Sequence, residues 1–590
     1  AVDAYNKALE EFEFNKYPAE CSFINKDLGR LLTTLSKTEN KEDNLKLALD
    51  CFSNALKFYT HNDYPLDYAN INLNKGLCYK VLGELTSDVE LIKSSIDSLK
   101  NCLTIYDDKN YPVQYANVQN ELGNSFITLS ENLDKAQNCK NAIEAYKSSL
   151  KVRTHENYPM QFALTSNNLG VAHITLSEIE DKIQNCETSV DCYIDSLKVY
   201  SLDNYPLQFA SVNSNLGSAY SVLAYEGKDT AKNFDNAINA YEKCLQVYTK
   251  DEFPVQFTSV QKCLADIYYK KSLSSESTDD ISKAIELYEL TLEAGEFDED
   301  SEDAAAVYSN LGMSFISLAN LSSDNHQYFE KANELFEKSL ELYDKDDYTD
   351  VHFEIKKQNG FCLTKIYEKT GEDDLFEQAR KSLEQCLPIY DIKNYEDEHK
   401  DILKQLAQLS VLRFKNKNTP ESLKASISRF ETYLDLINLK DSPREYGIVN
   451  RELGLLYRDR SNLEKRNEFM HISTRYFENA LKAYNSSDYK KEYDEITELI
   501  EESDSAAKVV EDKDFGDSPE ELDEAIKHYE EILKSLDSEA NEDQFYSYKN
   551  KLATTYLSKF EHDKDKTILQ KAIDNFTEIL ENYEIISAED

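Results

Sequence analysis

The chain has 590 residues, of which 41% are hydrophobic, with 66 Lys and Arg against 111 Asp and Glu and a formal net charge of −45. A single compact core rarely grows this large, so we expect several domains or an array of repeats. The negative charge repels phosphate backbones and anionic lipid headgroups, which excludes nucleic acid and membrane surfaces. It favours a basic protein or peptide as the partner, with a merely solvated acidic surface as the alternative reading.

The sequence lacks the patterns of catalytic, metal-binding and membrane proteins. Its eleven cysteines contain no Cys-x-x-Cys spacing, its histidines form no i, i+4 pair, and its glycines form no phosphate-binding loop. No apolar run approaches the roughly 18 residues that span a bilayer. We therefore expect no enzyme, no cofactor, no metal and no membrane anchor. The chain starts at Ala1 without a signal-peptide pattern, as a processed chain or a fragment would, so its start does not identify the compartment. A cytoplasmic location is slightly favoured, with secretion as the alternative if a signal peptide was removed before Ala1.

An aromatic-proline pair recurs through the first half of the chain. Its intervals are 47 residues, and 48 for the last step, at Tyr17-Pro18, Tyr64-Pro65, Tyr111-Pro112, Tyr158-Pro159, Tyr205-Pro206 and Phe253-Pro254. A glycine keeps the same period at Gly29, Gly76, Gly123, Gly170, Gly217, Gly312, Gly360 and Gly454, with Ala265 and Ala407 in the slots between. A fixed period of about 20 to 50 residues is the signature of stacked repeats.

Each repeat is predicted to be helix, turn, helix. Pro159 suits the first turn of a helix, since its φ is fixed near the helical value and its missing N–H would have no partner there. Apolar and small residues then recur three or four apart to His173, which predicts a first helix, A, with a polar turn over 176–185. A second stripe, Val190, Tyr193, Leu197 and Tyr200, predicts helix B.

The leucine that closes helix B occurs thirteen times from Leu9 to Leu580, 47 or 48 residues apart except for a step of 52 between Leu481 and Leu533. The insertion is expected beside the acidic stretch 511–517. A glycine in the middle of helix A costs about 1 kcal/mol relative to Ala, so its recurrence predicts a close approach of two helices. The residue before the closing leucine is Ala, Ser or Cys in nine of the thirteen copies, which indicates that the cysteines pack and do not react. Ser442 and Ser518 each precede a Pro and stand three residues before a Glu, which predicts capping boxes.

Two local strings resemble the tetratricopeptide repeat (TPR): Asn167-Asn168-Leu169-Gly170, and 142–150 with its Ala-Ile, Tyr and Ser-Leu. The standard repeat has about 34 residues, and the 47-residue period is similar to arrays found beside caspase-like (CHAT) modules and, more loosely, to kinesin light chain. The resemblance implies an all-α, right-handed α-solenoid (superhelix) of stacked antiparallel helix pairs. We expect one solenoid over 1–590, with a lone B helix in 1–16, regular repeats over 17–488 and two C-terminal repeats over 489–590, the first with a five-residue insertion.

Asparagine recurs near the glycine of helix A, although it is a mediocre helix former. In related solenoids a ladder of such amides along the A helices holds an extended peptide, because an amide both donates and accepts. A solvated polar face is the alternative. The candidate partner-binding residues are Asn70, Asn74, Asn117, Asn120, Asn124, Asn167, Asn168, Asn213 and Asn215, with Asn72 and Asn310 in the same pattern.

The ends of the chain carry apolar faces without a covering helix in the sequence pattern. Solenoids need polar caps, so either flanking sequence is missing or molecules stack end to end. The candidate self-association residues are Val2, Tyr5, Leu9, Phe576, Ile585 and Ile586. Three functions follow as expectations: a non-catalytic interaction scaffold that binds an extended, basic segment in the A-helix groove, a self-assembling head-to-tail filament, or the regulatory arm of a caspase-like peptidase.

Overall fold

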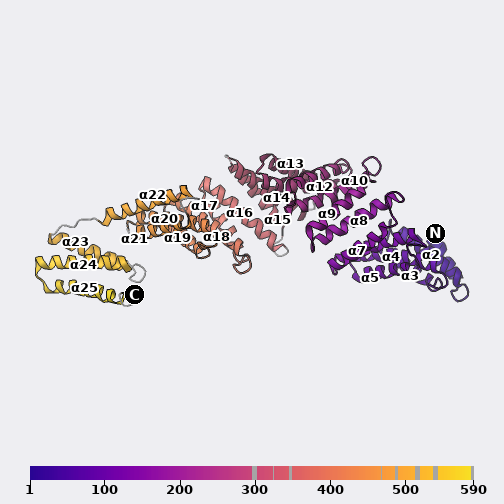
Figure 1. Ribbon diagram of the computed structural model, residues 1–590, viewed down its shortest axis with the longest axis horizontal. Helices are drawn as coiled ribbons and strands as arrows, with labels where there is room; N and C mark the ends of the chain where they lie inside the picture. Colours follow the sequence, from indigo (N-terminus) through magenta and orange to yellow (C-terminus); the bar gives the residue numbers. More distant parts are fainter. Residues whose placement is uncertain are drawn as a thin grey trace. The chain divides into compact units, whose positions relative to one another are not determined.

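The structure is a computed structural model that describes residues 1–295, 302–322, 325–343, 348–466, 468–484, 489–511, 518–535 and 542–586. These residues form 25 helices and no strand (Figure 1). The order is one single helix, α1 (Val2–Glu11), followed by twelve A/B pairs. The all-α class predicted from the sequence is confirmed.

The A helices carry even numbers. Their bounds are α2 (Pro18–Leu35), α4 (Pro65–Thr86), α6 (Pro112–Ser130), α8 (Pro159–Ser177), α10 (Pro206–Tyr225), α12 (Pro254–Ser275), α14 (Glu302–Leu321), α16 (Thr349–Thr370), α18 (Glu396–Lys417), α20 (Pro443–Glu464), α22 (Lys490–Glu511) and α24 (Glu542–Asp563). The B helices are α3 (Lys41–Ala55), α5 (Val89–Leu103), α7 (Lys135–Leu150), α9 (Lys182–Leu197), α11 (Thr230–Cys244), α13 (Thr278–Ala294), α15 (His326–Leu342), α17 (Asp373–Cys386), α19 (Pro420–Leu434), α21 (Glu468–Ala483), α23 (Pro519–Ser535) and α25 (Lys566–Ile586).

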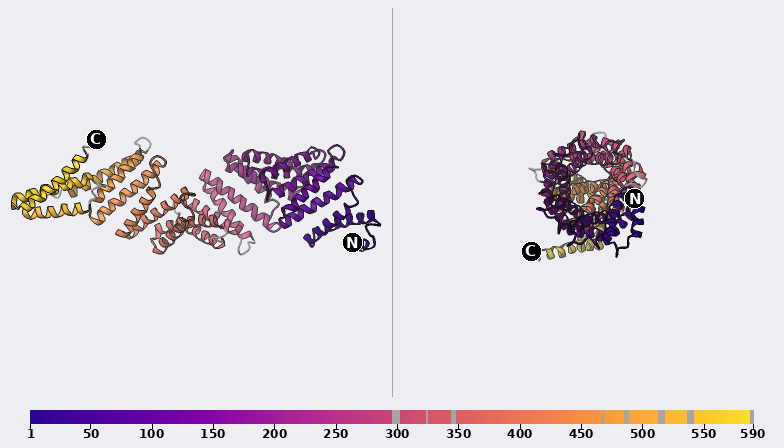
Figure 2. Two further views of the ribbon diagram at one scale, coloured as in Figure 1. Left: turned by 90° about the horizontal axis from the view of Figure 1, so that it is seen from below. Right: turned by 90° about the vertical axis from the view of Figure 1, so that its right-hand side faces the viewer.

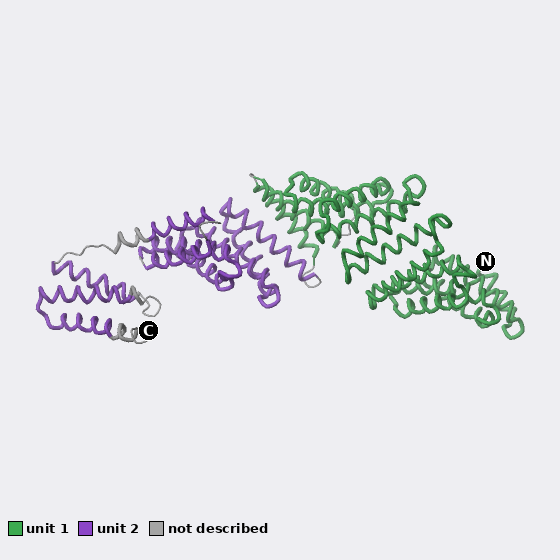
Figure 3. The backbone as a smooth tube through the Cα atoms, viewed as in Figure 1, with its two compact units in different colours: residues 1–343 green, residues 344–590 purple. Residues whose placement is uncertain are grey.

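The chain divides into two compact units, residues 1–343 and 344–590 (Figure 3). Within each unit most A helices pack against their own B helix, the pair α22 and α23 being the exception, and most B helices pack against the next A helix (Figure 2). Each unit is therefore a helical solenoid segment. One continuous solenoid over 1–590 stays a prediction, and the predicted insertion beside 511–517 falls, apart from the last residue of α22, outside the described residues.

The Tyr-Pro marker begins helix A as predicted. Tyr158 has φ −141° and ψ 61°, outside the helical region, and Pro159 is the first helical residue. The two predicted capping boxes differ. Ser518 accepts from the backbone N–H of Glu521 at 3.3 Å, and its own N–H donates to the Glu521 carboxylate at 3.2 Å. Ser442 makes no such bond, because it has φ −137° and ψ 61°, the backbone conformation of the Tyr residues that hold its position in other repeats.

The recurrent glycine has the predicted role. A Cβ on Gly170 would lie 2.5 Å from Cε1 of Tyr193 on the paired B helix, and Gly123 faces Tyr146 in the same way. The small residue before the closing leucine is buried and, where it is Ser or Cys, also bridges the pair. The Ser196 hydroxyl donates to the carbonyl of Ala163 at 2.9 Å, and the Cys244 thiol donates to Ala210 at 3.2 Å.

Burial keeps the thiols of Cys102 and Cys244 protonated. The pKa of Cys244 is raised to about 12 by desolvation, and Cys102 has the same environment and a pKa of about 12. The thiolate is the nucleophilic form of cysteine, so these thiols pack and donate hydrogen bonds. This agrees with the packing role inferred from their exchange with Ala and Ser.

Candidate protein-binding groove

The A helices of unit 1 form one continuous surface. Each of α2, α4, α6 and α8 packs against the A helix of the next repeat, and α12 packs against α14. Between α10 and α12 the approach is less close. This is the step at which the spacing of the aromatic-proline pairs rises from 47 to 48 residues. We call the surface of α4 to α12 the A-helix groove.

The central part of this groove is almost free of charge. Helices α8 and α10 contain no Asp, Glu, Lys or Arg, and α6 contains only Glu121. The residue after each helix-starting proline is apolar and exposed, at Leu66, Val113, Met160, Leu207 and Val255, the last with 74% of its surface accessible. In a chain with 111 carboxylates, an uncharged surface that combines amides, hydroxyls and exposed apolar side chains is unlike an ordinary solvated face.

A pocket of about 240 Å³ opens in this groove between α10 and α12. Its lining is neutral and includes Ser211, Ser214, Asn215, Tyr248, Val255 and Gln256. The lining residues come from the preceding A helix, from the connector after helix B and from the first turns of the next A helix. We call the space between two successive A helices, at these repeat positions, an inter-repeat niche.

Three of the predicted asparagines lie inside the helix packing. Asn72, Asn120 and Asn213 have 4%, 1% and 0% of their surface accessible. Asn72 and Asn213 donate to backbone carbonyls one turn earlier, at 2.9 and 2.8 Å, and Asn120 accepts from the Thr165 hydroxyl at 2.9 Å. Their prediction as partner-binding residues is corrected: they stand three or four residues before the recurrent glycine, which places them on the buried stripe of the helix.

Other asparagines fasten successive A helices to each other. Asn124 accepts from the Tyr146 hydroxyl at 2.8 Å and from the Asn168 amide at 3.1 Å. Asn215 donates to Asn167 at 3.1 Å. The amides thus form a ladder between repeats, but these hydrogen bonds join side chains of this chain to one another and not to a partner.

One repeat carries a variant of this arrangement. Asp266, which takes the place of Asn124 relative to the recurrent glycine slot, accepts from the Tyr288 hydroxyl and, at 3.0 Å, from the amide of Asn310. The α12 repeat therefore has the carboxylate of Asp266 at the position where the α6 repeat has the neutral amide of Asn124.

The amides that can still meet a partner are fewer than predicted. Asn70 and Asn117 are exposed, and Asn74, Asn167, Asn168 and Asn215 are half-buried. Asn74 donates to Asn70 on the same helix at 2.9 Å. The exposed apolar residues and the glutamines that follow the prolines were not predicted as part of the groove, although their recurrence as Pro-apolar-Gln was visible in the sequence at 112–114, 159–161, 206–208 and 254–256.

In unit 2 the corresponding surface is charged. A pocket of about 330 Å³ is lined at the equivalent positions of α18 and α20 by Lys404, Gln405, Glu445, Ile448 and Val449. Lys404 pairs with Glu445 at 2.7 Å. The neutral groove is therefore a property of unit 1.

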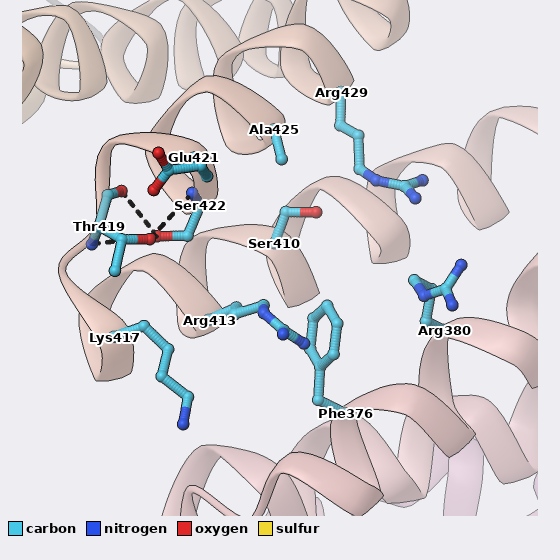
Figure 4. Close-up of a pocket in the computed structure, with 10 residues that line it drawn as sticks. All are labelled: Phe376, Arg380, Ser410, Arg413, Lys417, Thr419, Glu421, Ser422, Ala425 and Arg429. Carbon is cyan, nitrogen blue, oxygen red and sulfur yellow. Dashed lines mark hydrogen bonds between the residues drawn. The ribbon is translucent and has the colours of Figure 1, made fainter.

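A second pocket of unit 2, about 430 Å³, gathers four cations (Figure 4). The Arg413 guanidinium lies 4.0 Å from the ring centre of Phe376. Each cation has a carboxylate partner: Arg380 and Arg413 pair with Glu377, Lys417 with Asp373, and Arg429 with Glu384. We interpret this cluster as an ion-pair network between α17, α18 and α19 rather than as a free anion site.

The predicted self-association residues lie at both ends. Val2, Tyr5 and Leu9 of α1 are half-buried against a core cluster that contains Leu28 and Leu32 of α2. Phe576 on α25 is half-buried, while the side chains of Ile585 and Ile586 lie outside the described residues. Two neighbours on α25 are more exposed, Ile573 at 46% and Leu580 at 65%.

The described residues contain neither a candidate metal site nor a candidate membrane span. No group of three or more His, Cys, Asp or Glu side chains among them is placed to hold a metal ion. None of the helices in the described part of the chain combines the length and the apolar character that a membrane crossing needs.

The chain resembles TPR arrays. The C-terminal part of a TPR repeat-containing protein from Cytophaga hutchinsonii is 14% identical, with 53% of this chain and 95% of that chain covered and a TM-score of 0.35. The apo form of the quorum sensor NprR from B. thuringiensis is 16% identical, with 68% and 100% covered and a TM-score of 0.35. A human IFIT1 dimer with m7Gppp-AAAA is 13% identical, with 80% and 90% covered and a TM-score of 0.29.

No protein-family model matches the chain, and no curated protein matches it in sequence. The likeness to solved structures concerns the fold and extends to no site residue.

Proposed function

We propose that this chain is a non-catalytic protein-interaction scaffold that binds an extended segment of a partner protein along the A-helix groove of unit 1. The observation that carries the proposal is the surface of α6, α8 and α10, whose only charged residue is Glu121 and in which exposed apolar side chains alternate with amides and hydroxyls. Extended peptides are recognised by such combinations, since their backbone needs donors and acceptors while their side chains need apolar contact.

The chemistry of the groove sharpens the expected partner. The expectation of a basic segment rests on the net charge of the whole chain, but α8 and α10 contain no carboxylate. Charges elsewhere act through solvent and are screened beyond about 10 Å at moderate salt. We therefore propose a segment whose central residues are uncharged, with basic flanks drawn in by the surrounding acidic surface.

The test is a triple substitution of exposed groove residues, Met160→Asp, Leu207→Asp and Val255→Asp. A display library of random peptides is selected against the wild-type protein, and the selected peptides are then measured against the variant. We expect at least about a hundredfold loss of affinity, because three apolar contacts worth roughly 1 kcal/mol each are replaced by desolvated carboxylates.

A matched control places Asp at exposed apolar positions of B helices, with Leu47→Asp, Ile194→Asp and Leu290→Asp, which are 52%, 42% and 38% accessible. This control adds the same charge and should bind the selected peptides like the wild type. Equal binding by the groove variant would contradict the groove as the binding surface.

Self-association is the second candidate, and the exposed apolar face of α25 favours it. Ile573 and Leu580 lie seven residues apart on one helix face, and contact with another copy would cover them. Light scattering should show a mass that rises with concentration in the wild type and stays monomeric in an Ile573→Asp, Leu580→Asp variant. A wild type that is monomeric at all concentrations would rule this candidate out. The peptidase-arm alternative rests on the sequence resemblance alone.

A further inference from the structure

One position of the repeat changes its chemistry in the middle of the groove. The residue six before the start of helix A is a tyrosine in most repeats, and its hydroxyl reaches a carbonyl in the first turn of the preceding A helix. Tyr106 donates to Leu66, Tyr200 to Met160 and Tyr484 to Arg444, at 3.3 to 3.5 Å. In the repeat between α6 and α8 this residue is Arg153.

Arg153 lies between α6 and α8, and its guanidinium donates to a side chain of each helix. It is the repeat equivalent of Tyr248, which lines the neutral pocket between α10 and α12. The Arg153 side chain is 7% accessible. Its Nη1 donates to the Thr165 hydroxyl and its Nη2 donates to the Asn117 side-chain oxygen, both at 2.7 Å. Asn117 is exposed, so the guanidinium lies directly beneath the groove surface.

Arg153 forms no direct ion pair. None of the described carboxylates lies within 4.0 Å of its guanidinium, and its Nε has no hydrogen-bond partner although it is buried. Desolvation lowers the pKa of Arg153, and the carboxylate of Glu121, which opposes this shift, also lies 3.7 Å from the ammonium of Lys80. The guanidinium itself is bonded only to neutral oxygens, and a buried charge without a bonded counterion is unfavourable.

The half-buried arginines named next are each paired with a carboxylate. Arg380, Arg429, Arg451 and Arg460 each have a carboxylate oxygen within hydrogen-bonding distance. Arg153 is more deeply buried than these four arginines, and it has no such partner among the described carboxylates. An anion supplied from outside the chain would complete its environment.

We propose that Arg153 is the cationic anchor of the groove and binds a carboxylate of the partner segment. Three of its five N–H groups, including Nε, are without a protein acceptor, which leaves donors for a carboxylate. The inference rests on the proposed function and adds to it one specificity-determining residue: apart from its basic flanks, the segment carries one charged group, a carboxylate that is either its C-terminal group or an Asp or Glu side chain.

The direct test follows the Arg153 Nε–H signal in nitrogen-15 spectra of the full chain, assigned by its loss in Arg153→Tyr. The probes are N-acetylglycine, which presents a terminal carboxylate, and N-acetylaspartate amide, which presents a side-chain carboxylate. We expect saturable shifts of this signal with at least one of the two, and the stronger probe identifies the source. N-acetylglycinamide, the neutral counterpart, should cause none. No shift with either carboxylate, or an equal shift with the neutral probe, would overturn the proposal.

The Arg153→Tyr variant should fold, since tyrosine occupies this position in neighbouring repeats, and an unchanged circular dichroism spectrum and melting temperature check this. It should weaken binding of the carboxylate probe by about tenfold to a hundredfold, the range for loss of a charged hydrogen bond. Lys147→Gln removes one exposed positive charge from α7 and should leave the affinity unchanged. If Arg153→Tyr and Lys147→Gln lost the same affinity, the loss would come from the long-range effect of one positive charge, which would contradict Arg153 as the anchor.

The two proposals fail separately. If the library yields groove-dependent peptides without any preference for a carboxylate, and Arg153→Tyr binds them like the wild type, the anchor is wrong while the groove stands. If no peptide depends on the groove but the Arg153 signal responds to the carboxylate probes, the anion site stands and the scaffold function fails.

Discussion

Replacing Gly170 by Val is expected to lower the free energy of unfolding of its helix pair by about 3 kcal/mol. The added atoms would enter the ring of Tyr193, which already lies 2.5 Å from the position of a Cβ. Tyr193 is fully enclosed, so the ring has nowhere to move and the two helices must separate. Gly170→Ala should cost about 1 kcal/mol, since the better helix propensity of Ala offsets part of the overlap.

Hydrogen exchange of the α8 and α9 amides is the suitable measurement, because repeat arrays unfold in parts and a single melting curve averages over them. The control is a double-mutant cycle. In a Tyr193→Ala background the Gly170→Val substitution should cost nothing further, as the cavity accepts the new side chain. If Val costs the same in both backgrounds, close helix approach is not the reason for the glycine.

The fold could be predicted because its determinants repeat. The aromatic-Pro pair starts helix A in six repeats, the glycine receives a B-helix side chain in eight, and the leucine closes helix B thirteen times, so the markers reinforce each other. Ser442 shows the limit of local rules. Its sequence has the form of a capping box, but the residue inherits the backbone conformation of the Tyr positions, and its side chain makes no cap.

The candidate site was predicted less well, for two physical reasons. All asparagines near the glycine were predicted to share one role because they share a residue type. Asn213, however, lies one turn from Gly217 on the buried face of α10, while Asn215 lies off that face. Net charge was assigned to the whole surface, although α8 and α10 carry none of it. Arg153 could have been found from its break in a column of tyrosines, but its lack of a counterion appears only when the neighbouring helices are in place.

Asp266→Asn is expected to stabilise unit 1 at neutral pH by about 1 kcal/mol, the order of the cost of burying a charged group that has only neutral hydrogen-bond partners. The Asn124 arrangement in the α6 repeat is the natural precedent, since its amide oxygen accepts both a tyrosine hydroxyl and an asparagine amide. The substituted amide keeps these two bonds, and its NH₂ group reaches solvent because the residue is half-buried.

The stability difference between the Asp266→Asn variant and the wild type should depend on pH. Desolvation raises the pKa of Asp266, although the bonds from Tyr288 and Asn310 and the nearby Lys262 oppose the shift. The folded state therefore holds its proton more tightly than the unfolded state, and the stability present below the unfolded pKa of about 3.9 is lost as the pH rises through the folded pKa. The variant lacks this loss, so its advantage over the wild type should be small near pH 3.5 and complete at pH 8. Hydrogen exchange of the α12 to α14 amides, measured at both pH values, tests this. An Asn variant less stable than the wild type at pH 8 would mean that the charged hydrogen bonds outweigh desolvation, and that the carboxylate is the preferred form at this position.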